Sequence, residues 1–73
     1  MIRRQTYINK LRDLGYTYKT HRKRTQLWRK VGGTHFIPVP KCDLLELDFV
    51  RSTLRQAGAS KDEIESFIGS AQS

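Results

Sequence analysis

Cysteine, histidine and long apolar runs are scarce in this 73-residue sequence, and each scarcity excludes a class of protein. The single cysteine, Cys42, cannot form an internal disulfide, and no paired Cys/His pattern suggests a metal site. No stretch approaches the roughly 18 apolar residues that a membrane span needs, and segment 1–15 has no apolar run of signal-peptide length. We therefore expect a cytoplasmic domain that uses no metal, no cofactor and no membrane.

The short chain also limits what the protein can enclose. A domain of this length buries only a modest core, so we expect a free energy of unfolding of a few kcal/mol and no large substrate cleft. Residues 1–69 are predicted to form one domain. Residues 70–73 are predicted to form a frayed tail.

Charge is distributed unevenly along the chain. Up to Lys41 the sequence has eleven Lys or Arg residues against one acidic residue, Asp13, whereas from Cys42 onward it has three basic and six acidic residues. The formal net charge of +7 is therefore the sum of +10 for residues 1–41 and −3 for residues 42–73. A basic half of this kind is typical of a surface that binds a polyanion, and the acidic half would face solvent or a protein partner.

The first third of the sequence predicts a helix followed by a strand. In segment 3–15, apolar residues recur at helical spacing, and Gly15 stands where a C-terminal cap would lie. The residues with this spacing are Tyr7, Ile8, Leu11 and Leu14. Segment 16–21 then alternates Tyr16, Tyr18 and Thr20 with Thr17, Lys19 and His21, which predicts a strand with one buried and one exposed face.

Two further strands, 25–31 and 34–40, are predicted to form a hairpin around the Gly32-Gly33 dipeptide. We expect a two-residue turn, because this dipeptide tolerates the positive φ angles of such turns. The resulting register pairs Val31 with Thr34, Lys30 with His35, Arg29 with Phe36, Trp28 with Ile37 and Gln26 with Val39. Trp28, Ile37 and Val39 then share a core-facing side, and Arg29 and Phe36 the other. Pro38 and Pro40 make the last strand an edge strand.

The C-terminal part of the sequence predicts two helices. Segment 43–58 returns to helical spacing, with Asp48 as the expected N-cap and Gly58 as the expected C-terminal cap. Ser60 and Glu63 have the spacing of a capping box, which predicts a short terminal helix. The expected fold is a small α+β domain of order α-β-β-β-α with a three-stranded antiparallel sheet, followed by that short helix.

This order of elements, together with the segments "KLRDLGY", "IPVP" and "LLELDFVRSTLRQAG", resembles the HicA-type mRNA interferase toxins of bacterial toxin-antitoxin pairs. The resemblance spans residues 7–59. It implies a fold like that of double-stranded-RNA-binding domains, RNA as the ligand, and an antitoxin-like protein as a partner.

The catalytic histidine of that family has no counterpart here. The family places it after a Gly-Ser pair at the start of the second strand, where this sequence reads "KRTQLW" with Thr25 or Gln26 at the histidine position. Neither side chain exchanges a proton near neutral pH. His21, which lies among four cations, and His35, which is expected to face Lys30, are the two candidates for a relocated catalytic residue.

Six cations between residues 19 and 30 form the predicted RNA-binding set, because Lys and Arg side chains neutralise backbone phosphates. They are Lys19, Arg22, Lys23, Arg24, Arg29 and Lys30. Trp28, in contrast, is expected to be a core residue that does not stack on bases.

We therefore interpret the sequence as an RNA-binding domain of HicA-like type without efficient ribonuclease activity. One alternative is an active endoribonuclease toxin that uses His35 or His21. The other is a protein-interaction module that binds through the terminal segment 64–70 or through the acidic residues Glu46, Asp62, Glu63 and Glu65.

Overall fold

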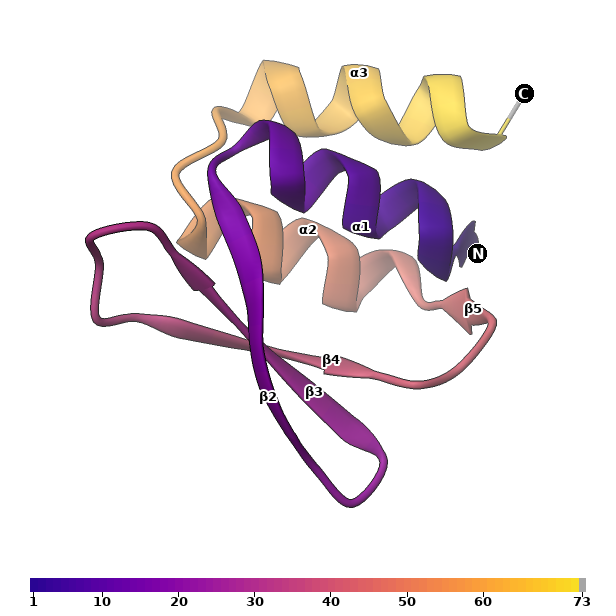
Figure 1. Cartoon of the computed structure of the whole chain (residues 1–73). Helices are drawn as coiled ribbons and strands as arrows, with labels where there is room; N and C mark the ends of the chain where they lie inside the picture. The colour runs from indigo at the N-terminus through magenta and orange to yellow at the C-terminus, as the bar shows by residue number, and fades with distance from the viewer. Residues whose placement is uncertain (73) are drawn as a thin grey trace.

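The computed structural model of the chain, which describes residues 1–72, has a three-stranded antiparallel sheet with helices against one face (Figure 1). The elements in chain order are β1 (Ile2–Arg3), α1 (Arg4–Asp13), β2 (Tyr16–Arg22), β3 (Thr25–Lys30), β4 (Phe36–Pro40), β5 (Leu44–Leu45), α2 (Leu47–Gln56) and α3 (Lys61–Gln72). Helices α1 and α2 lie between the sheet and α3 (Figure 1). The sheet order β2-β3-β4 confirms the predicted α+β class and places β4 at an edge, as its two prolines indicated.

A short second sheet joins the N-terminus to the segment that follows the basic half. Strand β1 pairs antiparallel with β5, with Ile2 opposite Leu45, and the Arg4 amide donates to the Asp43 carbonyl at 2.8 Å. Ile2 and Leu45 are both buried. This pair could not be predicted from the sequence, because two-residue strands show no alternation.

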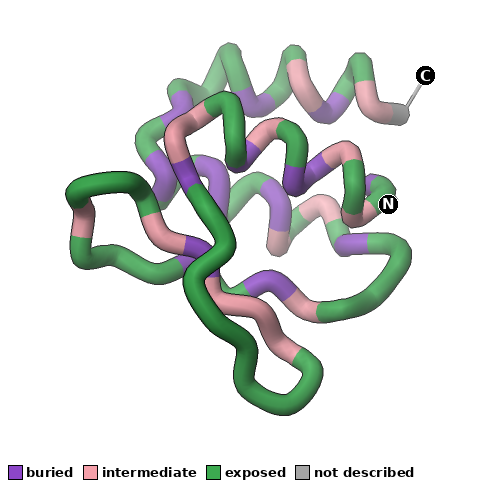
Figure 2. Tube along the Cα trace, viewed as in Figure 1, coloured by how far each residue is buried: buried purple, intermediate pink, exposed green. Residues whose placement is uncertain are grey.

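The core lies between the helices and the inner face of the sheet (Figure 2). Its largest fully buried side chains are Tyr7, Ile2, Leu11, Ile37, Leu54, Val39 and Val50. The Tyr7 hydroxyl lies 2.6 Å from Thr53 Oγ1, and Thr53 Oγ1 donates a hydrogen bond to the Phe49 carbonyl at 2.8 Å. Burial raises the pKa of Tyr7 to about 12, so its hydroxyl stays protonated at neutral pH.

The β3–β4 hairpin has the predicted register but a longer loop. Trp28 lies opposite Ile37, and the strands end at Lys30 and begin again at Phe36, so the predicted pairs beyond them do not form. The two-residue turn was wrong because the Val31 amide donates to the Gly15 carbonyl at 3.1 Å instead of pairing across the hairpin. The Gly33 amide donates to the Lys30 carbonyl at 2.9 Å, and Gly32 has a φ of 82°. This is the geometry of a type II turn over residues 30–33.

Strand β2 departs from its predicted alternation. Only Tyr16 is buried, and the register with β3 shifts between Tyr18 and Thr20. Lys19 is the extra residue of this bulge, and an extra residue moves all later side chains to the opposite face. His21 therefore shares a face with Tyr18, although the sequence pattern placed them on opposite faces.

The cap residues of α2 were predicted correctly at one end only. Its N-cap is Glu46, without a side-chain hydrogen bond, and Asp48 lies in the first turn, where a carboxylate favours the helix dipole without capping it. At the other end Gly58 has a φ of 100°. Its amide donates to the Arg55 carbonyl, and the Ala59 amide donates to the Leu54 carbonyl, which is the Schellman pattern.

Helix α3 begins as predicted and runs further than predicted. Ser60 Oγ accepts a hydrogen bond from the Glu63 amide at 3.2 Å, which confirms the predicted cap. The helix continues through Gln72, where a frayed tail from residue 70 was expected, and Ser73 of that tail lies outside the described residues. Ile64 and Ile68 are buried, so α3 belongs to the core.

Two glycine-to-alanine substitutions are expected to have opposite effects on stability. Gly58→Ala should lower the free energy of unfolding by about 1 to 2 kcal/mol, because alanine is strained at positive φ. Gly69→Ala, at an exposed position inside α3, should raise it by about 0.5 to 1 kcal/mol. A Cβ meets no atom within 4 Å at either position, so the difference measures backbone conformation alone. Urea unfolding of both variants tests this, and equal effects would contradict the Schellman assignment.

Candidate nucleic-acid interface

The β2–β3 hairpin projects beyond the helices, and its outer half is largely exposed (Figures 1 and 2). Arg22 pairs with Thr25, which leaves Lys23 and Arg24 as a two-residue turn. Lys23 has a positive φ of 52°. The Lys41 amide donates to the Arg24 carbonyl at 3.0 Å, so the chain after β4 holds the turn in place.

The structure brings four of the six predicted cations together at this tip. Lys19 lies at the bulge, Arg22 ends β2, and Lys23 and Arg24 form the turn, all with exposed side chains. The other two cations of the set lie elsewhere. Arg29 is half-buried, with its guanidinium 5.9 Å from the centre of the Phe36 ring, and Lys30 ends β3 at the opposite end of the hairpin.

None of the carboxylates in residues 1–72 forms an ion pair with a cation of the tip. Within residues 1–72 the ion pairs are Lys10 with Glu63 at 3.6 Å and Arg51 with Glu65 at 3.0 Å, and both join α3 to another helix. The tip therefore keeps four positive charges in a water-exposed position, where they can contact phosphates.

Helix α1 adds two arginines that the sequence analysis missed. Arg4 Nε donates to the Pro40 carbonyl at 3.1 Å, and Arg4 Nη2 donates to Gln26 Oε1. The Arg12 guanidinium lies 5.6 Å from the centre of the Trp28 ring, in cation-π geometry. The available signal was the spacing of four residues from Arg4 to Ile8 to Arg12, which places them along one side of the helix.

Gln26, one of the two residues that the resemblance places at a histidine position, has a structural role in this fold. Gln26 Oε1 accepts hydrogen bonds from Arg4 and from Trp28 Nε1, the latter at 3.2 Å. The Gln26 side chain therefore links α1 to β3 and accepts the hydrogen bond of the buried indole N–H. Thr25 is half-buried between Arg22 and Pro40 on the neighbouring strands.

The two histidines lie in different surroundings. His21 Nδ1 is 2.8 Å from the Tyr18 hydroxyl, on the tip that carries the cations. His35 lies in the loop before β4, and its Nε2 is 3.3 Å from Gln56 Oε1 of α2. The expectation that His35 pairs with Lys30 was wrong, since the β3–β4 pairing stops at Arg29 and Phe36 and His35 lies before β4. Of the two, only His21 lies beside the tip cations in sequence and in the hairpin.

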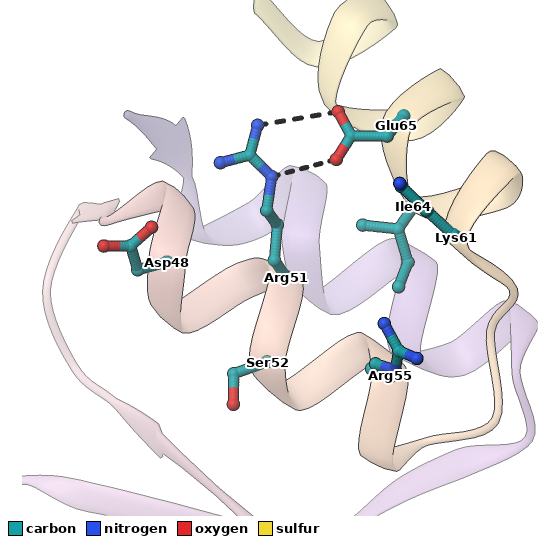
Figure 3. Close-up of a pocket in the computed structure, with 7 residues that line it drawn as sticks. All are labelled: Asp48, Arg51, Ser52, Arg55, Lys61, Ile64 and Glu65. Carbon is teal, nitrogen blue, oxygen red and sulfur yellow. Dashed lines mark hydrogen bonds and ion pairs between the residues drawn. The ribbon is translucent and has the colours of Figure 1, made fainter.

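The surface suggested for a protein partner is partly used within the fold. Glu63 and Glu65 form the two ion pairs, Ile64 and Ile68 of segment 64–70 are buried, and Asp62 and Glu46 are exposed. Figure 3 shows a hollow between α2 and α3, with the Arg51–Glu65 pair on one side and Arg55 on the other.

None of the helices in the described range combines the length and apolar character that a membrane crossing requires. Within the same range, no three His, Cys, Asp or Glu side chains lie close enough to hold a metal ion. Comparisons of the chain with models of protein families, with curated proteins and with solved structures give no match.

Proposed function

We propose that this domain binds RNA and that the tip of the β2–β3 hairpin is its main phosphate-binding surface. The observation that carries the proposal is the cluster of four exposed cations, Lys19, Arg22, Lys23 and Arg24, on a projecting hairpin that no carboxylate of the described chain neutralises. Cations placed in this way release counterions from a nucleic-acid backbone when they bind it.

The resemblance to HicA-type toxins supports RNA as the polyanion and an antitoxin-like protein as a partner, and both remain part of the proposal. A cytoplasmic location belongs to it as well. The free and exposed Cys42 fits a reducing compartment, where unpaired thiols persist. Efficient cleavage is not part of the proposal, because the side chain at the family's histidine position is Thr25 or Gln26.

A pair of matched double variants tests the proposal. Lys23→Ala with Arg24→Ala removes two charges from the tip, whereas Arg55→Ala with Lys61→Ala removes two exposed charges from the α2–α3 side. The tip variant should bind RNA more weakly and flatten the slope of log K against log salt by up to about 1.4 to 1.8. The helix variant should keep the wild-type slope.

The measurement is a salt titration of binding to a labelled RNA hairpin and to a labelled single strand. Equal slopes for the two double variants would contradict the assignment of the tip, because they would show that only total charge matters. No binding by the wild-type protein to either RNA would contradict the proposed function itself.

A further inference from the structure

A groove runs between α1 and the β2–β3 hairpin, and it is bordered by Arg4, Ile8, Arg12, Tyr18, Gln26 and Trp28. It consists of two open hollows of about 370 and 390 Å³ that share the residues Arg12, Tyr18 and Trp28. We call this surface the α1–hairpin groove.

Tyr18 is the aromatic residue that the groove offers to a ligand. Its side chain is 47% exposed, and its ring stands edge-on to Trp28, with centroids 6.1 Å apart and planes at 76°. Its hydroxyl is held by His21, which the Lys19 bulge brings to the same face of the hairpin. Trp28 is 3% exposed and forms the floor, so the exposed ring is that of Tyr18.

The charge of the groove indicates the chemistry of its occupant. No carboxylate lines either hollow in the described part of the chain, and Arg12 stands between them with an exposed side chain. Arg4 is already engaged by Gln26 and Pro40, so Arg12 is the arginine placed to meet a ligand. The Tyr18 ring, beside the exposed Arg12 guanidinium that lies over Trp28 and next to the cationic tip, suits a nucleotide whose base is unpaired.

We infer that the α1–hairpin groove is a nucleobase site in which an unpaired base of single-stranded RNA stacks on Tyr18, with Arg12 beside it. This inference rests on the proposed function, because the tip supplies the phosphate contacts that bring the strand to the groove. It adds a preference for unpaired over fully paired RNA, since a base inside a duplex cannot reach Tyr18.

Two substitutions at Tyr18 separate stacking from packing. Tyr18→Phe keeps the aromatic face and loses the hydroxyl, whereas Tyr18→Leu keeps an apolar side chain and loses the face. Tyr18→Leu should weaken binding to a single-stranded dodecamer by at least about fivefold, because one base stack contributes that much or more. Binding to a blunt duplex of the same length should be unchanged. Tyr18→Phe should bind both RNAs as the wild type does.

Trp28, the only tryptophan of the chain, supplies a second measurement from the groove floor. Single-stranded RNA should change its emission in the wild type and in Tyr18→Phe, and duplex RNA should not. Circular dichroism checks that Tyr18→Leu is folded. If that variant is not folded, Arg12→Gln, at an exposed helix position, takes its place and should lower single-strand affinity only.

Each outcome decides the inference. Equal losses for single-stranded and duplex RNA, or no loss in Tyr18→Leu, would overturn the nucleobase site while the salt slopes of the tip variants still supported the proposed function. Absence of any RNA binding by the wild type would overturn both. Weaker binding of Tyr18→Leu to single-stranded RNA only, together with wild-type binding of Tyr18→Phe, supports the nucleobase site.

Discussion

Trp28→Ala should leave the domain mostly unfolded at room temperature. Removing a buried tryptophan is expected to lower the free energy of unfolding by about 3 to 5 kcal/mol, which is comparable to the whole stability of a domain this small. Trp28 lies opposite Ile37 on the inner face of the sheet, donates its indole N–H to Gln26 and lies beneath Arg12. Its loss therefore opens a cavity at the junction of α1 and the sheet.

The measurement for this variant is urea unfolding followed by circular dichroism, since the variant lacks the tryptophan needed for fluorescence. Phe36→Ala is the matched control. Phe36 lies opposite Arg29 on the outer face of the same two strands and is 41% exposed, so its loss should cost about 1 kcal/mol or less. A Trp28→Ala variant with normal stability and lost RNA affinity would show that the indole stacks on bases.

The purified domain should degrade RNA slowly compared with an efficient mRNA interferase. Loss of a general base typically lowers the rate by about 10² to 10⁴, and neither Thr25 nor Gln26 can act as one. Gln26 Oε1 also accepts hydrogen bonds from Arg4 and Trp28, which fixes the side chain in a structural role. Cations near a bound phosphate can still stabilise the transition state, so a weak residual activity is compatible with this prediction.

The assay follows the decay of a labelled messenger with the wild type, with His21→Ala and with His35→Ala. The Lys23→Ala and Arg24→Ala double variant serves as a control, because decay that persists unchanged in it comes from a contaminating nuclease. Rapid decay in the wild type that disappears in His21→Ala would contradict the prediction and identify His21 as a relocated catalytic residue. The corresponding loss in His35→Ala would place the reaction at the α2 side of the loop, beside Gln56.

Local patterns predicted the features that depend on neighbouring residues. The spacing of Tyr7, Ile8 and Leu11 marked the buried side of α1, and Gly58 marked the end of α2 because its backbone angle suits glycine. The position of the Gly pair was enough to set the β3–β4 register and to bury Trp28, even though the loop is longer than expected. The cations of the candidate interface were likewise visible in the sequence, since the hairpin tip is continuous along the chain.

The features that could not be predicted depend on contacts between residues far apart in the sequence, because no local pattern encodes such contacts. The β1–β5 pair joins residues more than 40 positions apart, and the Val31 amide turns to Gly15 instead of its hairpin partner. The bulge at Lys19 reverses the alternation of β2 after Tyr18, which places His21 on the same face as Tyr18 and within hydrogen-bond distance of its hydroxyl. The helices, the sheet and the basic hairpin could be predicted from the amino-acid order alone, because periodicity, turn residues and charge specify them. The groove with Arg12 and Tyr18 was decided only by the packing of α1 against the sheet, since its two sides come from elements whose relative position is a property of the whole fold.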